Sequence, residues 1–98
     1  MVYITNKDET EAKKIAKHLL DKKLIACANV FPISSVYKWK GKLKDTKEVV
    51  AIVKTKKENF EKIITEIKKV HSYECPCVIK IDVESNKEFE NWVMKECQ

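Results

Sequence analysis

The feature that most constrains the fold of this chain is a pair of apolar segments on either side of its single glycine. Residues 24–33 are apolar almost without interruption, Gly41 supplies a turn, and residues 48–55 form a second apolar run. This pattern predicts a β-hairpin over residues 24–55, with a bend or bulge at Pro32. At about 3.3 Å per residue, the arms would reach about 45 Å, well beyond a typical strand. The distal part should therefore overhang its own domain and be covered in an oligomer.

Shorter apolar runs and three helix caps define the remaining elements. Residues 2–5 and 73–83 predict strands. Each predicted helix begins with a capping residue followed three positions later by glutamate. The pairs are Asp8 with Glu11, Thr55 with Glu58, and Ser85 with Glu88.

The resulting order, β-α-β-β-α-β with a further helix at the C-terminus, is typical of an α+β ferredoxin-like sandwich. In such a fold, helices cover one face of an antiparallel sheet. With 98 residues, the chain supports one domain, residues 1–98. The uncovered sheet face would be apolar, so closed cyclic assembly is expected.

Composition excludes several classes of function. All 20 basic residues are lysines. Without arginine to bind phosphate bidentately, the net charge of +5 indicates a soluble surface rather than a nucleic-acid partner. No apolar stretch could span a bilayer and no secretion signal is visible, so we expect a cytoplasmic protein with reduced cysteines and no membrane partner. A single glycine excludes P-loops and dinucleotide-binding turns.

Candidate metal ligands gather after the second predicted helix. His71 and Glu74 supply an imidazole and a carboxylate that suit Cu²⁺ or Zn²⁺, and Tyr73 lies between them. Cys75 and Cys77 place two thiols on one face of an extended segment, as a soft chelate for Cu(I) or Zn²⁺. The structural alternative is that His71 caps its helix, Tyr73 packs at a subunit contact and the cysteines fill space. One imidazole and one carboxylate make an incomplete site, which favours the structural role for His71.

Aromatic residues supply candidate interface anchors. Tyr37 and Trp39 share one face of the distal hairpin, Tyr73 follows the second helix, and Trp92 lies on the last helix. Base stacking is the alternative role, and the lack of arginine disfavours it. Lysines beside the turn either steer an anionic ligand or keep the tip soluble.

Several segments together give the chain a family resemblance. They are Ala26-Cys27-Ala28-Asn29-Val30, Ser35-Val36-Tyr37-Lys38-Trp39-Lys40-Gly41-Lys42, Glu48, Lys54-Thr55, His71-Ser72-Tyr73-Glu74-Cys75-Pro76 and Trp92. Over essentially its whole length, the chain resembles the CutA family of divalent-cation tolerance proteins. The resemblance implies a PII-like homotrimer with long hairpins, tolerance of copper and other divalent metals, and no established enzymatic activity. The positions expected to bind copper in some relatives correspond here to Ile4, Val70 and His71. Of the metal ligands expected at these three positions, this chain retains only His71.

We therefore expect a trimeric, non-enzymatic protein that binds Cu²⁺ or another divalent metal and needs no cofactor to fold. Its ligands would come from His71, Glu74, Cys75 and Cys77. The alternative is a PII-like signalling trimer that binds a small anion between subunits. An enzyme that uses His71 as a base ranks last, because the sequence shows no nucleophile, base and orienting group together.

Overall fold

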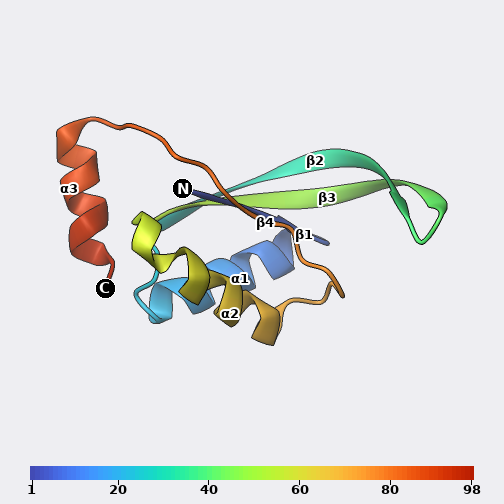
Figure 1. The fold of residues 1–98 in the computed structure, drawn as a ribbon, viewed down its shortest axis with the longest axis horizontal. Coiled ribbons are helices and arrows are strands. Elements are labelled where there is room, and N and C mark those ends of the chain that lie inside the picture. The colour runs from blue at the N-terminus through green and yellow to red at the C-terminus, as the bar shows by residue number, and fades with distance from the viewer.

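A computed structural model describes residues 1–98 as a four-stranded antiparallel sheet with three α-helices (Figure 1). In chain order, the elements are β1 (Val2–Asn6), α1 (Glu9–Asp21), β2 (Cys27–Trp39), β3 (Lys42–Lys54), the 3₁₀ helix η1 (Lys57–Asn59), α2 (Phe60–Val70), β4 (Val78–Lys80) and α3 (Lys87–Glu96). The strand order is β2-β3-β1-β4, and every neighbouring pair is antiparallel. This arrangement confirms the predicted α+β ferredoxin-like fold with its extra C-terminal helix.

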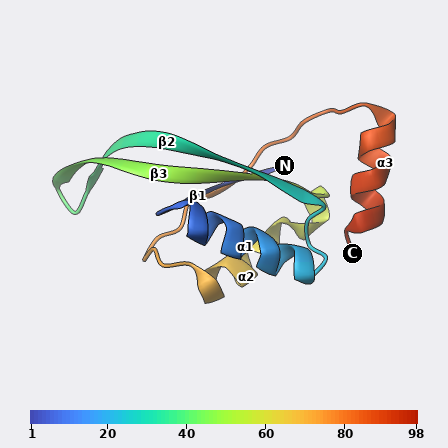
Figure 2. The same cartoon turned by 180° about the vertical axis from the view of Figure 1, so that it is seen from behind.

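Strands β2 and β3 form the predicted long hairpin. They pair residue by residue from Cys27 opposite Lys54 to Trp39 opposite Lys42. Lys40 and Gly41 close the turn with φ angles of 51° and 79°, a left-handed region that glycine adopts without strain. The molecule measures 45 Å along its longest axis, and the hairpin extends along that axis beyond both helices of the core (Figure 2). The expected overhang is therefore present.

Of the bend or bulge predicted at Pro32, the bulge is wrong. Pro32 lies opposite Val49 in an unbroken register. The physical reason is the position of β2 at the edge of the sheet, where a residue without an N–H group can remain in a regular strand.

Helices α1 and α2 pack against one face of the sheet, and no helix covers the other face (Figure 1). Burial of a large aliphatic side chain contributes about 1.5–3 kcal/mol to stability. The buried residues between sheet and helices are Val2, Ile4, Ala12, Ile15, Leu19, Leu24, Ile25, Ala51, Val53, Ile63 and Ile67. A smaller cluster of Ala26, Val93 and Cys97 attaches α3 near the base of the hairpin.

The first predicted helix cap is confirmed and the second is wrong. The Asp8 carboxylate accepts a hydrogen bond from the backbone N–H of Glu11 at 2.8 Å, as expected at the start of α1. The Thr55 hydroxyl instead donates to the backbone carbonyl of Leu24 at 2.6 Å. That carbonyl is buried at the base of the hairpin and needs a donor, so α2 begins without a side-chain cap, after η1.

The last strand and the last cap also differ from expectation. Strand β4 covers only Val78–Lys80 of the predicted residues 73–83, because it pairs with the five-residue strand β1 and the chain then leaves the sheet. Helix α3 follows Asn86 without a side-chain cap, so the predicted pairing of Ser85 with Glu88 is wrong. No helix combines the length and the apolar character that a membrane span requires.

Candidate functional site

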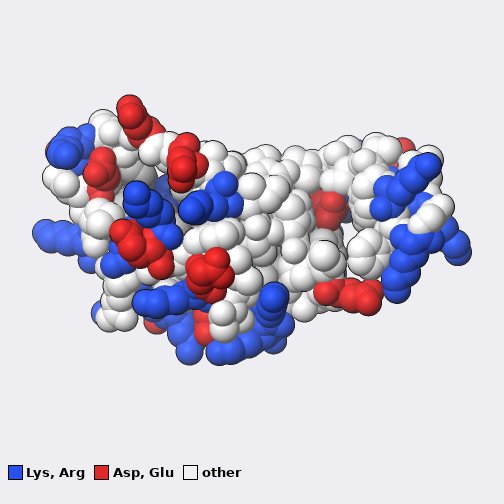
Figure 3. Space-filling model, viewed as in Figure 1, with Lys and Arg blue, Asp and Glu red and all other residues white.

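The candidate site is a cavity of about 690 Å³ beneath the distal half of the hairpin. We call it the hairpin cavity. Its walls come from the distal hairpin and from the segment between α2 and β4. In the space-filling view, a hollow opens below the distal hairpin, and acidic side chains lie in it and beside it (Figure 3). The lining residues used below are Tyr37, Trp39, Glu48, Tyr73, Glu74, Cys75 and Cys77.

Strand alternation explains why Glu48 lies in this cavity. Glu48 is two residues from Val50, which pairs with Thr5 of β1, so these side chains share the helix-free face of the sheet. The Glu48 side chain is deeply buried, with the residue only 8% exposed. Sequence reasoning missed Glu48 as a site residue. The available signal was a carboxylate at the start of an otherwise apolar run, residues 48–55.

Tyr73 provides a hydrogen bond that partly replaces the hydration lost by the buried Glu48 carboxylate. Its phenolic O–H donates to Glu48 Oε2 at 2.7 Å. Burial, together with the hydrogen bond to Glu48 and its charge, raises the pKa of Tyr73, so the phenol stays protonated and remains a donor. The other Glu48 oxygen has no hydrogen-bond partner within the chain.

His71 positions Tyr73 through a hydrogen bond and through packing of the two rings. The backbone N–H of Tyr73 donates to His71 Nδ1 at 3.0 Å, so His71 Nε2 carries the proton and donates to the Thr5 carbonyl at 2.8 Å. The two rings also pack together, with centroids 4.7 Å apart. Both imidazole nitrogens are therefore occupied within the chain, and a metal could bind His71 only after one of these bonds opens.

Glu11 anchors the same segment to α1. Its carboxylate accepts hydrogen bonds from the backbone N–H groups of Ser72, at 3.0 Å, and Lys7, at 2.9 Å. Burial on its own would raise the pKa of Glu11, but the hydrogen bonds from Ser72 and Lys7 hold it below its usual value. The sequence had indicated Glu11 only as part of a helix cap.

The remaining predicted metal ligands lie in or beside the cavity. Cys75 is exposed and Cys77 is partly buried, and burial raises the pKa of the Cys77 thiol. The Glu74 carboxylate is at the rim, 3.4 Å from Lys40 Nζ. No three side chains of histidine, cysteine, aspartate or glutamate are grouped as a complete metal site. The four-residue ligand set of His71, Glu74, Cys75 and Cys77 thus stays a prediction.

The structure separates the four predicted interface anchors into two groups. Tyr37, Trp39 and Tyr73 line the hairpin cavity. Trp92 lies on α3, where its ring packs 5.6 Å from that of Phe89. Tyr37, Trp39 and Trp92 remain about 40% exposed, so each leaves apolar surface that a partner could cover.

A ferredoxin-like chain with an overhanging hairpin has the fold of the PII-like α+β proteins. The chain belongs to the CutA1 divalent ion tolerance protein family, whose family model matches residues 1–96. It is 46% identical over 93 residues to the divalent-cation tolerance protein CutA of Archaeoglobus fulgidus, covering 94% of this chain and 91% of the relative.

Solved structures of relatives agree in fold. The crystal structure of CutA1 from Pyrococcus horikoshii has a TM-score of 0.93 at 39% identity, covering 99% of this chain and 96% of the relative. The PII-like protein CutA from Nostoc, in its apo form, has a TM-score of 0.89 at 29% identity, covering 99% of this chain and 96% of the relative. The Archaeoglobus protein is described as periplasmic. A cytoplasmic location for this chain therefore stays a prediction.

Proposed function

We propose that this chain forms a non-enzymatic homotrimer that contributes to divalent-metal tolerance by binding a metal ion, such as copper, in the hairpin cavity. The observation that carries the proposal is that the two thiols of Cys75 and Cys77 line one cavity with the carboxylates of Glu48 and Glu74. Thiolate and carboxylate groups together suit soft and borderline metals. The names of the relatives support metal tolerance as the broader role.

Unpaired strand edges and exposed apolar side chains of the single chain support the proposed trimer. The outer edges of β2 and β4 have no strand partner. The helix-free face bears apolar side chains such as Phe31 and Ile79, which are 38% and 49% exposed. Unpaired edges and apolar patches are normally covered, and cyclic assembly covers them in every subunit alike. A neighbouring subunit could then also close the open side of the hairpin cavity.

Within the cavity, we expect the thiols to be the principal ligands. Cys75 and Cys77 are separated along the chain by one proline, and both line the cavity. His71 is held by two hydrogen bonds, so it would contribute only after rearrangement. Zn²⁺ and Cu(I) are therefore better matched to this site than a hard cation such as Mg²⁺.

Calorimetric titration with Zn²⁺ tests the proposal without redox chemistry. The Cys75→Ser/Cys77→Ser double variant should lose binding, whereas His71→Ala should keep most of it. Cys97→Ser is a matched control, because Cys97 is buried in the separate cluster beside α3. Equal zinc binding by the wild type and the Cys75/Cys77 double variant would exclude this site.

A second candidate function is PII-like signalling through a small anion bound between subunits. The likeness to the PII-like Nostoc protein favours it, as do the lysines around the hairpin turn. The acidic lining of the cavity opposes it. A thermal-shift screen of nucleotides and small carboxylates should raise Tm for at least one compound if this function is correct.

A further inference from the structure

The hairpin cavity has an unusual charge, because one of its carboxylates is buried. Two carboxylates, Glu48 and Glu74, contribute to its lining, and no lysine, arginine or histidine does. Glu48 is only 8% exposed and forms no salt bridge within the chain. Buried carboxylates are normally paired with a cation, since one hydrogen bond replaces only part of the lost hydration. The cavity therefore lacks a positive charge that a ligand could supply.

From this observation, we propose that the hairpin cavity binds a compact organic cation with a primary ammonium group, and that Glu48 is its counter-ion. The open oxygen of Glu48 would accept a hydrogen bond from the ammonium, while Tyr73 continues to donate to the other oxygen. This site goes beyond metal binding: it shares Glu48 with the proposed metal site, but it depends on the aromatic walls rather than on the thiols.

The aromatic walls favour the same kind of ligand. The rings of Tyr37, Trp39 and Tyr73 line the cavity, and aromatic faces attract cations and cover alkyl groups. The chain itself supplies an example at the rim. Lys40 Nζ lies 5.6 Å from the centroid of the Trp39 ring and 3.4 Å from the Glu74 carboxylate. One aromatic ring and one carboxylate of this cavity thus already accept an ammonium group.

The need for a hydrogen bond to the open oxygen of Glu48 favours some cations over others. A primary ammonium offers three N–H donors, whereas a quaternary ammonium offers none to Glu48. A hard metal ion requires several oxygen ligands, and no such group is assembled here. We therefore expect the order of affinity to be alkylammonium, then tetramethylammonium, then a neutral alcohol of the same size.

Titration of the full-length protein with n-butylammonium chloride, followed by ¹H–¹⁵N NMR, tests this site. The indole N–H of Trp39 and the backbone amides of Glu48 and Tyr73 should shift and saturate. Glu48→Gln keeps an acceptor for Tyr73 but removes the charge, so it should weaken binding by about tenfold or more. Glu61→Gln, an exposed carboxylate on α2 outside the cavity, is the matched control and should leave binding unchanged.

Three results would overturn the proposal. They are no saturable shift in the wild type, unchanged binding by a folded Glu48→Gln variant, and binding of tetramethylammonium or 1-butanol as tight as that of butylammonium. Circular dichroism establishes whether Glu48→Gln is folded. If it unfolds, Trp39→Leu replaces it and should also weaken butylammonium binding, with unchanged affinity counting against the site. The Cys75→Ser/Cys77→Ser variant should retain butylammonium binding, so the ammonium and metal sites can fail separately.

Discussion

The Tyr73 hydroxyl is the donor that allows Glu48 to be buried. Their hydrogen bond, at 2.7 Å, joins the segment after α2 to strand β3. If the hydroxyl is removed, a buried carboxylate loses its only partner in the chain, and a group left in this state costs about 1–3 kcal/mol or more. This bond therefore links the stability of the fold to the geometry of the cavity.

We predict that Tyr73→Phe lowers the free energy of unfolding by about 1–3 kcal/mol. Urea denaturation measures the change. In the Glu48→Gln background, the same substitution should cost less, because a neutral amide tolerates the loss of a donor better than a carboxylate does. An equal cost in both backgrounds would show that the hydroxyl does not act through Glu48.

At this scale, the sequence predicts only part of the site. Tyr73, Cys75 and Cys77 are close along the chain, so their proximity could be predicted directly. Glu48 is separated from Tyr73 by 25 positions, and only strand register brings the two side chains together. The occupation of both His71 nitrogens also depends on a backbone carbonyl of β1, which no residue spacing reveals.

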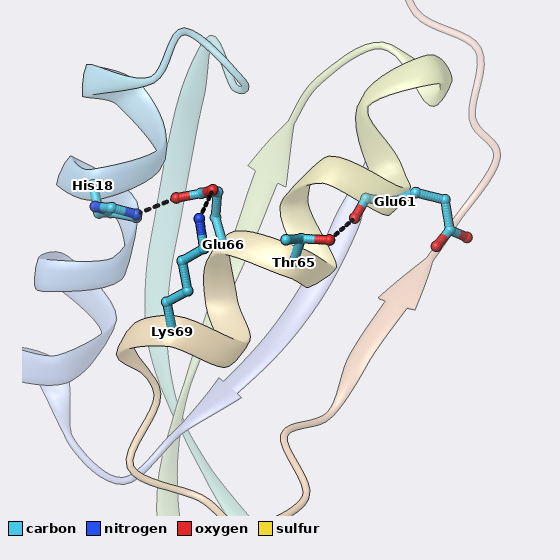
Figure 4. Close-up of polar contacts among 5 residues, drawn as sticks. All are labelled: His18, Glu61, Thr65, Glu66 and Lys69. Atoms are coloured by element: carbon cyan, nitrogen blue, oxygen red, sulfur yellow. Dashed lines mark hydrogen bonds and ion pairs between the residues drawn. The ribbon is translucent and has the colours of Figure 1, made fainter.

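Helices α1 and α2 are linked on their outer surface by a carboxylate that contacts two basic side chains (Figure 4). Glu66 Oε1 lies 2.9 Å from His18 Nε2 of α1, and Glu66 Oε2 lies 2.8 Å from Lys69 Nζ. The hydrogen bonds from Lys69 and His18 lower the pKa of Glu66 to about 2, against 4.5 without these partners. The neighbouring Glu61 side chain points away from this group, while its backbone carbonyl accepts a hydrogen bond from Thr65.

This lowered pKa predicts a pH-dependent contribution to stability. The ionised form of Glu66 is favoured in the folded state, so its contribution is present above about pH 4.5 and is lost as the pH falls towards 2. Wild type should therefore be more stable than Glu66→Gln near pH 6, and the difference should shrink near pH 2. Urea denaturation across this range measures it. Glu61→Gln is the matched control, and a difference for Glu66→Gln that is independent of pH would contradict the assignment.

The elements themselves were largely predictable, whereas their boundaries were not. The hairpin and α1 have long, strongly patterned sequences, and the structure contains both where expected. The helix cap predicted at Thr55 is wrong, because Thr55 and Asn59 both donate hydrogen bonds to the buried Leu24 carbonyl. A local motif cannot reveal such a distant acceptor. Likewise, β4 is short because only residues 2–4 of β1 pair with it, which depends on pairing rather than on apolar content.

For the whole molecule, the hairpin that extends past the helices is the feature that connects fold to proposed function. The single chain has an apolar sheet face, two free strand edges and one open side of the cavity. A trimer would cover all three, and it would place each metal site beside a neighbouring subunit. Assembly and metal binding are therefore expected to occur together in the same particle.

Native mass spectrometry of the zinc-loaded protein tests this central claim most directly, because it reports subunit number and bound metal in one spectrum. We predict an assembly of three 11.4 kDa subunits that carries one zinc ion per subunit. The Cys75→Ser/Cys77→Ser variant should form the same trimer without zinc. A monomer of 11.4 kDa, or a trimer that retains no zinc in the wild type, would contradict the account.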